Sequence, residues 1–216
     1  LFDDELKKSN KKTYQQMIFE AAELEWKKQK PRIYLDEKEK AFGEKFIINN
    51  QLNNKELIGI HLGASPRWPS KAWDELELKK FIFIAYKKGY EVLLFGGPDE
   101  IERHKKVAQE LKKEGIKIYQ NNPLNSNREF FSLVNICDAM VCGDSFALHV
   151  ALSLGKPTIG LFFCTSPHEV EDYSLLKKLI APRLFDFFPE RMNEYNEELT
   201  KSIKAETVLK EIEEIL

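Results

Sequence analysis

The stretch AMVCGDSFALHVALSLGKPTIGLFFCT, residues 139–165, decides the fold. It predicts a short apolar strand that stops at Gly143, a polar turn, a helix that ends at Gly155-Lys156-Pro157, and a second apolar strand over 158–162. Glycine accepts the left-handed conformation that often ends a helix, and proline cannot continue the helix. Two apolar strands joined through a helix are typical of a parallel sheet that is covered on both faces.

The polar turn inside this stretch is suited to an anion. Asp144 and Ser145 are both favourable N-cap residues, so their side-chain oxygens are expected to accept hydrogen bonds from the first helix N–H groups. His149 follows Ser145 by four residues, and on a helix both lie on one side near the positive N-terminal end. Thr165 lies in the turn after the second strand. We therefore expect a phosphate site at the start of this helix.

Strands and helices continue to alternate on both sides of this stretch. The sequence predicts further strands over 56–63, 90–97, 116–119 and 178–181, and helices over 74–89, 99–115, 128–136 and 204–216. Regular alternation with apolar strands predicts an α/β domain with a Rossmann-like doubly wound parallel sheet. Ligands of such sheets bind at the carboxyl ends of the strands, where the polar, glycine-rich turns of this half fall.

Residues 1–55 lack this alternation and predict a mainly helical segment. We expect an amphipathic helix over 9–29, a second helix over 36–50 and a polar linker over 50–55. The buried stripe expected on the first helix consists of Tyr14, Met17, Ile18, Ala21 and Leu24.

The chain begins with Leu1 rather than methionine, and we expect it to be a fragment. Two parts are predicted: residues 1–55 as the tail of an N-terminal domain plus a linker, and residues 56–216 as the Rossmann-like domain. An apolar helix separated from its own domain would favour dimerisation of the fragment.

The composition sets broad limits. The 216 residues carry a formal net charge of −2 and are 43% hydrophobic, so no overall charge favours nucleic acid. No apolar run approaches the roughly 18 residues that cross a bilayer, and no signal-peptide pattern is recognised. Cys137, Cys142 and Cys164 lack metal-ligand spacing, so we expect buried thiols and a cytoplasmic location. Trp73 is expected to anchor the core.

The loop HLGASPRWPSKAW follows the first strand of the Rossmann-like half. Gly63 and Ala64 permit a close approach of the backbone to a ligand, Ser65 offers a hydroxyl, and Lys71 offers a point charge suited to phosphate. Taken alone, the loop is as consistent with a solvated surface that carries a lysine.

The next loop contains Gly96, Gly97, Asp99 and Glu100. Two carboxylates at a helix start are explained by the helix dipole alone. The alternative is that Glu100 accepts ribose hydroxyls, as acidic residues do in related folds. The sequence leaves both interpretations open.

Several classes of site are excluded by missing motifs. The sequence has no G-x-S-x-G nucleophile elbow, no G-x-G-x-x-G after the first strand, no P-loop and no D-x-D carboxylate pair for a divalent metal. A metal-free diphosphate site that uses a helix dipole, hydroxyls, Lys71 and His149 fits better.

Four segments together resemble a known family. HLGAS…SKAW, EVLLFGGPDE, NICDAMVCGDSFALHVALSLGKP and TIGLFFCTSP are similar, in order and spacing, to the C-terminal half of the bacterial lipopolysaccharide heptosyltransferase family. The resemblance implies a metal-independent, inverting glycosyltransferase without a resident cofactor. Two Rossmann-like domains face each other in this GT-B arrangement. The C-terminal domain holds a nucleotide-diphosphate sugar, typically ADP-heptose, and the N-terminal domain holds the acceptor and the carboxylate base.

The resemblance also implies roles for single residues. Lys71, with Ser65 nearby, would contact the donor phosphates and offset the charge of the leaving diphosphate. Glu100 would contact the nucleoside. Thr165 matches the threonine of the closing loop. Because the base belongs to the N-terminal domain, it is expected outside this chain.

Asp144, Ser145 and His149 match the family's D-[ST]-G-x-x-H turn, which wraps the diphosphate and the sugar. Phe146 replaces the glycine of that turn, and Phe163-Cys164 replaces the Gly-Pro of the family's L-F-G-P. A phenylalanine there would be strained if its φ were positive.

The resemblance implies a saccharide or lipid-linked saccharide acceptor of the lipopolysaccharide type, and peripheral association with the inner face of the cytoplasmic membrane. Two alternatives stay open at this point. One is a degenerate, non-catalytic sugar-nucleotide-binding domain, and the other is an enzyme similar to sugar-nucleotide epimerases.

Overall fold

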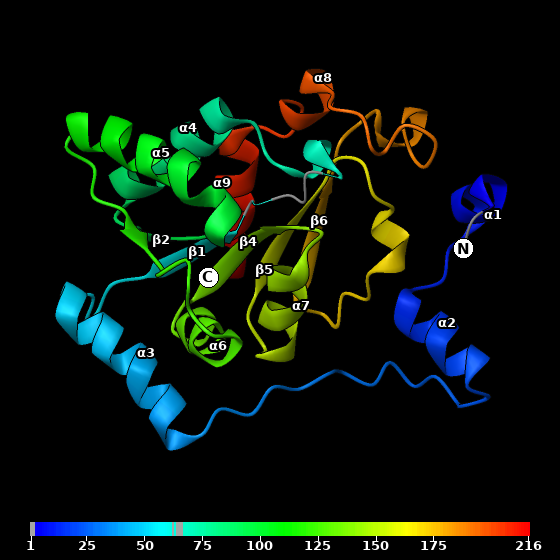
Figure 1. Cartoon of the computed structure of the whole chain (residues 1–216), viewed down its shortest axis with the longest axis horizontal. Coiled ribbons are helices and arrows are strands. Elements are labelled where there is room, and N and C mark those ends of the chain that lie inside the picture. Colours follow the sequence, from blue (N-terminus) through cyan, green and yellow to red (C-terminus); the bar gives the residue numbers. More distant parts are fainter. Residues whose placement is uncertain (1–2, 62, 64–66) are drawn as a thin grey trace.

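A parallel sheet forms the centre of the molecule (Figure 1). The computed structural model describes residues 3–61, 63 and 67–216. Within these residues the sheet has six strands in the order β3-β2-β1-β4-β5-β6, and all neighbours are parallel. The strands are β1 (Leu57–His61), β2 (Glu91–Phe95), β3 (Tyr119–Gln120), β4 (Ala139–Gly143), β5 (Thr158–Phe162) and β6 (Leu176–Ile180). This order reverses direction between β1 and β4, which confirms the doubly wound, Rossmann-like prediction.

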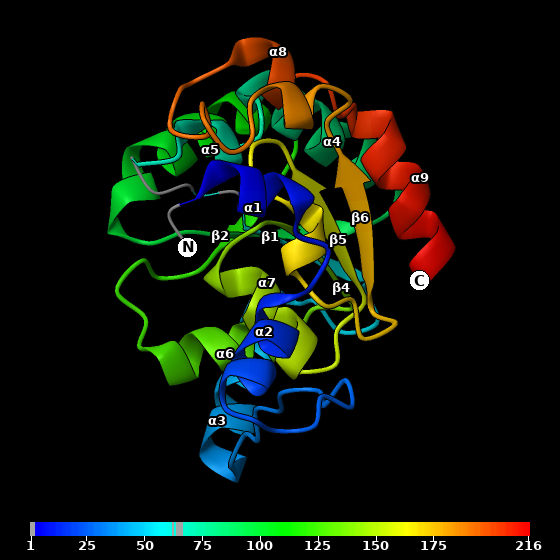
Figure 2. The same ribbon diagram turned by 90° about the vertical axis from the view of Figure 1, so that its right-hand side faces the viewer.

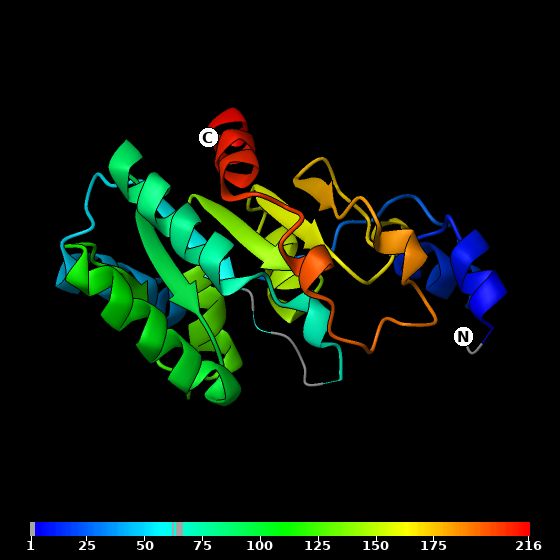
Figure 3. The ribbon, with the colours of Figure 1, turned by 90° about the horizontal axis from the view of Figure 1, so that it is seen from above.

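Helices cover both faces of the sheet (Figures 1 and 3). The helices on one face are α4 (Glu75–Lys88), α5 (Ile101–Lys113) and α9 (Ala205–Ile215). The helices on the other face are α6 (Asn127–Asn135) and α7 (Phe146–Ser153), with α3 (Glu37–Asn50) packed against α6. Strands β1, β2, β4 and β5 are buried along nearly their whole length, as parallel strands between two helical layers should be.

Local capping explains where several helices begin and end. Asp36 and Glu39 form a capping box at the start of α3, which confirms the helix predicted over 36–50. Asp74 accepts hydrogen bonds from the first turn of α4. Gly89 ends α4 with a φ of 97°, and Gly155 follows α7 with a φ of 80°. Both glycines adopt the left-handed conformation that other residues avoid.

The residues predicted to be buried lie in the core. Trp73 is 1% exposed, and its indole N–H donates to the Ile203 carbonyl at 2.9 Å. Cys137, Cys142 and Cys164 are buried free thiols. Burial raises the pKa of all three thiols, so they are protonated near neutral pH.

The single helix predicted over 9–29 is wrong. Two short helices form instead, α1 (Asp4–Ser9) and α2 (Tyr14–Ala21). Thr13 starts the second helix because its side chain accepts a hydrogen bond from a backbone N–H in the first turn. Glu23 takes a φ of 56°, and the chain then runs without helix to the start of α3.

The buried stripe expected on this helix is also wrong. Ile18 and Leu24 are 65% and 60% exposed, so the stripe faces away from the core. The segment is held instead by polar contacts such as that between Lys11 Nζ and His168 Nε2, 3.1 Å apart. Figures 1 and 3 show α1 and α2 beside the stretch that follows β5, at the end of the molecule opposite α3, and this end faces the viewer in Figure 2. The N-terminal segment therefore lies near the carboxyl end of the sheet.

Smaller differences concern the edges of the sheet. The strand predicted over 116–119 is reduced to two residues, because Ile116 N donates to Leu111 O and belongs to the turn that ends α5. Strand β6 begins at Leu176, two residues before the predicted start. The short helix α8 (Glu197–Thr200) had no predicted counterpart. The division of the chain near residue 55 stays a prediction.

Candidate functional site

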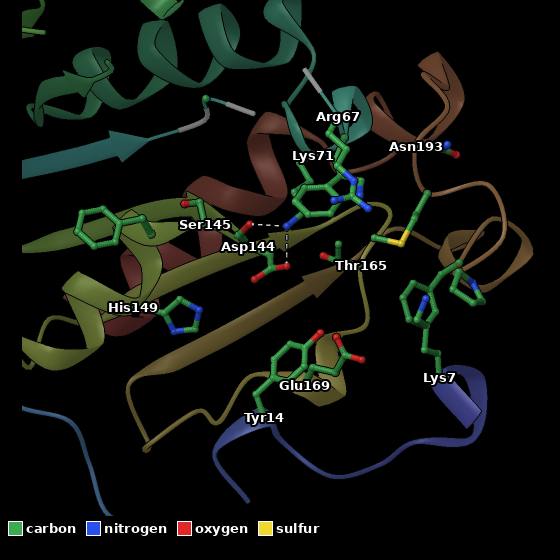
Figure 4. Close-up of a pocket in the computed structure, with 16 residues that line it drawn as sticks. Lys7, Tyr14, Arg67, Lys71, Asp144, Ser145, His149, Thr165, Glu169 and Asn193 are labelled. Atoms are coloured by element: carbon green, nitrogen blue, oxygen red, sulfur yellow. Dashed lines mark hydrogen bonds and ion pairs between the residues drawn. The ribbon is translucent and has the colours of Figure 1, made fainter. Parts of the chain in front are cut away.

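A cavity of about 660 Å³, lined by polar and apolar side chains, lies at the carboxyl ends of β1, β4 and β5 (Figure 4). The loop after β1, the start of α7, the turn after β5, helices α1 and α2, and the loop over 188–193 all contribute to its walls. The predicted site residues that line it are Gly63, Lys71, Asp144, Ser145, His149 and Thr165. The structure thus brings together residues that are separated by as many as 102 positions in sequence, from Gly63 to Thr165.

Lys71 reaches across the cavity to the start of α7 (Figure 4). Its ammonium donates to Asp144 Oδ2 at 2.9 Å and to the Asp144 carbonyl at 3.0 Å. The ammonium also lies 4.7 Å from the centre of the Trp68 ring, a cation–π contact. The Lys71 and Asp144 side chains are only 16% and 20% exposed, so salt screens their ion pair less than a surface pair. Asp144 and Trp68 therefore fix the charge of Lys71 inside the cavity.

The start of α7 offers an unsatisfied hydroxyl. Ser145 occupies the N-cap position, but the predicted capping bonds do not form: its side chain caps nothing, and the Asp144 carboxylate turns to Lys71. Ser145 Oγ is buried and finds no hydrogen-bond partner within the described residues. A buried hydroxyl without a partner is costly. The first N–H groups of a helix also have no partner within the helix. This end of α7 is therefore arranged for a ligand with several acceptor oxygens.

His149 lies one turn into α7 and lines the same cavity as Ser145, as its spacing predicts. Desolvation by the surrounding protein lowers the pKa of His149, the Asp144 charge acts against this, and Lys71 adds to the lowering. The imidazole is therefore neutral near pH 7 and can donate one hydrogen bond and accept another.

Thr165 lies in the turn after β5, where it is 6% exposed and points into the cavity (Figure 4). The remaining hydroxyl predicted for the site, that of Ser65, lies outside the described residues, and so does Ala64. Their roles stay predictions.

Glu100 lies beside the cavity but is engaged locally. Its Oε1 is so close to Gly63 that a Cβ on Gly63 would come within 2.5 Å of it. Its Oε2 accepts a hydrogen bond from Gly97 N at 2.8 Å, so the carboxylate serves the helix start. Gly96 packs against the ring of His104. None of the described atoms of Gly96, Gly97 or Glu100 belongs to the cavity wall, and a contact of Glu100 with ribose stays a prediction.

Several residues that line the cavity were not predicted from the sequence to belong to the site. Lys7 and Tyr14 come from α1 and α2, and Glu169 comes from the short 3-10 turn after β5. The wall residues from the C-terminal loop are Phe188, Pro189, Met192 and Asn193. Tyr14 was assigned to an apolar stripe, and only its hydroxyl distinguishes it there. No local pattern indicates that these segments meet.

Tyr14 and Glu169 face each other at one edge of the cavity (Figure 4). Burial and then the nearby Glu169 carboxylate raise the pKa of Tyr14 to about 12, so its hydroxyl keeps its proton beside Glu169. Burial also raises the pKa of Glu169, and the nearby Asp144 charge raises it further. The Tyr14 hydroxyl, Lys7 and Lys71 lower this pKa and so act against the burial.

Phe146 is compatible with the turn that it occupies. It is the first residue of α7 and does not have a positive φ, so the expected strain does not arise. Its ring centre lies 6.0 Å from those of Phe130 and Phe131 on α6. Phe163 and Cys164, the other departures from the family pattern, are 1% exposed and belong to the core.

Across residues 3–61, 63 and 67–216, no three His, Cys, Asp or Glu side chains are grouped so that they could hold a metal ion. In the same part of the chain, no helix combines the length and the apolar character needed to span a membrane.

Fold and site together define a class of protein. A Rossmann-like sheet carries, at its carboxyl edge, a cavity with a fixed lysine, a helix start and a buried hydroxyl that has no partner among the described residues; such a cavity is chemically suited to an anionic small molecule. The chain belongs to glycosyltransferase family 9 (heptosyltransferase), whose family model matches residues 5–184. The family predicted from the sequence is thereby confirmed.

Individual relatives agree with this membership. Lipooligosaccharide heptosyltransferase 2 of Haemophilus influenzae is 27% identical over 170 residues, which are 76% of this chain and 49% of the relative. Among solved structures, a glycosyl transferase family 9 protein of Veillonella parvula matches with a TM-score of 0.79 at 19% identity, over 96% of this chain and 61% of that one. The E. coli ADP-heptose lps heptosyltransferase II matches with a TM-score of 0.71 at 22% identity, over 90% of this chain and 56% of that one.

These structural matches confirm the fold. The chain spans about half or less of the length of the curated relatives that it matches, 49% of the Haemophilus influenzae protein and 37% of a Salmonella typhimurium one.

Proposed function

We propose that this chain is the donor-binding part of a glycosyltransferase that moves a sugar from a nucleotide-diphosphate sugar to a saccharide acceptor in lipopolysaccharide assembly. The donor that we propose is ADP-heptose. Two findings support this choice: membership of the heptosyltransferase family, and the shared fold with an E. coli protein named for ADP-heptose.

The observation that carries the proposal is the buried Ser145 hydroxyl at the start of α7, which has no hydrogen-bond partner in the described part of the chain and follows the residue that holds the Lys71 ammonium. A diphosphate supplies what this place lacks, because its oxygens accept from a hydroxyl, from helix N–H groups and from an ammonium at once. Thr165 and the neutral His149 line the same cavity and would add hydrogen bonds to the diphosphate or the sugar. Glu100, beside Gly63, is the proposed contact to the ribose.

The proposed reaction is a displacement at the anomeric carbon. The acceptor hydroxyl oxygen forms the new bond, the bond from the anomeric carbon to the diphosphate breaks, and the electron pair leaves with the diphosphate. Lys71 would stabilise the charge that develops on this leaving group. The acceptor proton would pass to a carboxylate base outside this chain, so the chain alone would bind donor without turnover.

We propose that the transfer is metal-independent, because Lys71 and the start of α7 offer positive charge where a divalent cation would otherwise be needed. A lipid-linked acceptor would place the enzyme in the cytoplasm, at the inner face of the membrane. This location is part of the proposal.

The alternative function is a degenerate, non-catalytic sugar-nucleotide-binding domain. Phe146 and Phe163 favour it, because they depart from the family's pattern at the diphosphate-binding turns. Phe146 fits its helix without a positive φ, and Phe163 is a core residue. Phe163 therefore gives no physical reason to expect a disabled diphosphate site, and Phe146 causes no backbone strain although it lines the cavity.

Replacing Phe146 by alanine tests this point. The ring is 55% exposed and contacts Phe130 and Phe131, so its loss should cost about 0.5–1.5 kcal/mol of stability, the range of an aromatic pair. Phe146 also lines the cavity, but its ring offers the diphosphate no hydrogen bond, so donor affinity should fall by less than about tenfold. Chemical denaturation and calorimetric titration measure the two quantities. A large gain in affinity would show that the ring obstructs the donor.

Titration of the full chain with ADP, ADP-sugars and UDP-sugars tests the proposed function. We expect an ADP-sugar to bind, and addition of EDTA to leave its affinity unchanged. If no nucleotide or nucleotide sugar binds up to millimolar concentration, the proposal is overturned. Detectable sugar transfer by a longer protein that includes this chain would eliminate the non-catalytic alternative.

A further inference from the structure

Glu169 lies where two cavities meet. It lines the 660 Å³ cavity that contains Lys71 and also a second cavity of about 530 Å³ between α1 and α2. Lys7 and Tyr14 line both cavities as well. These three side chains therefore form the boundary between the proposed donor site and a space next to it.

The carboxylate of Glu169 has a hydroxyl beside it and lies on a fixed turn. The Tyr14 hydroxyl, which stays protonated, faces this carboxylate from α2. The turn that carries Glu169 is fixed by Lys178, whose ammonium donates to the carbonyls of Pro167 at 2.7 Å and Val170 at 2.5 Å. A carboxylate that accepted one hydrogen bond from Tyr14 would still have further lone pairs for a ligand.

Two cations near Glu169 already have anionic partners, and a third, Lys178, donates to backbone carbonyls of the turn. Lys71 pairs with Asp144 at 2.9 Å, and Lys7 pairs with Asp4 at 3.3 Å. A diphosphate bound to Lys71 would draw that charge toward itself, so the region beyond the diphosphate would present the carboxylates of Asp144 and Glu169. Such a region favours neutral hydroxyl groups and disfavours another carboxylate.

We propose that Glu169, oriented by Tyr14, accepts hydrogen bonds from hydroxyls of the transferred sugar and selects neutral polyhydroxylated sugars over sugar acids. The inference rests on the proposed function, because it assumes that the cavity holds a nucleotide-diphosphate sugar. It assigns the junction of the two cavities to the sugar part of the donor. Glu169 is thus a specificity residue, and Tyr14 is a positioning residue that acts through it.

The test uses the full chain and a matched pair of ligands, ADP-glucose and ADP-glucuronic acid, which differ only at C6. ADP alone reports on the nucleotide part. If the earlier titration selects uridine, the corresponding UDP compounds are used. The wild type should bind the neutral sugar about tenfold more tightly than the acid, the factor expected when a charged hydrogen bond is replaced by repulsion.

Glu169→Gln keeps the shape and the acceptor for Tyr14 but removes the charge. Its affinity for the neutral sugar should fall about tenfold, its preference over the acid should shrink to within about threefold, and its ADP affinity should not change. Tyr14→Phe should move the preference in the same direction by less. Glu190→Gln, which removes a carboxylate that lines neither cavity, should leave all three affinities unchanged.

The glutamine variant is expected to fold. The pKa of Glu169 is raised in the folded state, so the folded protein binds the proton more tightly than the unfolded chain, and stability is lost as pH rises through that pKa. At pH 7 the ionised carboxylate therefore opposes folding, and Glu169→Gln should be at least as stable as wild type.

The outcomes separate the two proposals. If ADP binds and Glu169→Gln leaves the preference between the two sugars unchanged, the inference is overturned while the proposed function stands. If neither ADP nor UDP compounds bind the wild type, the proposed function fails and the inference falls with it.

Discussion

Replacing Lys71 by alanine is expected to weaken binding of the nucleotide-diphosphate sugar by ~1–3 kcal/mol, a factor of roughly 5 to 150, as removal of a charged hydrogen bond does. The reason is the position of the ammonium, which is fixed in the cavity by Asp144 at 2.9 Å and by the Trp68 ring. A charge held in place loses little freedom when the diphosphate arrives, so most of its attraction appears as affinity. Calorimetric titration with an ADP-sugar measures the loss.

Loss of Lys71 also changes what Asp144 does. Without its cation, the Asp144 carboxylate would face the diphosphate as a like charge and add to the loss of affinity. The double variant Lys71→Ala with Asp144→Asn should therefore bind better than Lys71→Ala alone. This non-additivity is the signature of two residues that act as a pair.

Two matched variants control for other causes. Lys71→Met keeps an apolar stem over Trp68, so it should lose nearly as much affinity as the alanine variant if charge is what matters. Lys106→Ala removes a lysine that is 60% exposed and pairs with Glu75, so it should change affinity by less than about twofold. Unchanged affinity in Lys71→Ala would return this lysine to the role of a surface residue.

The parts of the fold predicted from the sequence are those in which local pattern and burial agree. Strands β4 and β5 are apolar throughout and buried, and the glycine after α7 has the left-handed φ that the sequence suggested. The prediction of one helix over 9–29 was wrong because there the local pattern and the burial disagree. Its periodicity was real, but Ile18 faces solvent and Thr13 supplies a local N-cap that restarts the helix.

The same contrast holds for the site. Residues at strand ends were predictable, because parallel strands bring their carboxyl ends to one edge. The hydrogen-bond and ion-pair partners of each side chain could not be predicted from the sequence. Ser145 lacks a capping bond, and Asp144 pairs with Lys71 across 73 positions of sequence. Glu169 and Tyr14 meet only because the N-terminal segment packs beside the turn after β5, a long-range contact that no local motif encodes.

Lys71 depends in turn on an anchor two residues away. Trp73 is 1% exposed, packs at 5.9 Å from the ring of Phe81 on α4, and donates to the Ile203 carbonyl at 2.9 Å. Its own carbonyl accepts from Arg103 on α5 at 2.9 Å. Trp73 thus joins the loop that carries Lys71 to three separate parts of the core.

Replacing Trp73 by alanine should lower the free energy of unfolding by about 3–5 kcal/mol, because the change opens a large cavity and leaves the Ile203 carbonyl without its donor. At about 2–4 °C per kcal/mol for a chain of this size, the melting temperature should fall by roughly 6–20 °C. Trp73→Phe keeps most of the ring and loses the N–H, so it should cost only about 1–3 kcal/mol. Denaturant titration and calorimetry measure both variants.

The matched control is Trp26→Ala, which removes a half-buried indole that contacts Phe19 in the N-terminal segment, and it should cost less than about 1.5 kcal/mol. Equal losses for Trp73→Ala and Trp26→Ala would contradict the anchoring role. Trp73→Phe should also weaken donor binding at temperatures where it is fully folded, because a looser loop leaves Lys71 less well placed. Stability and affinity would then fall together through one buried side chain, since the loop that holds the charge is itself held by the core.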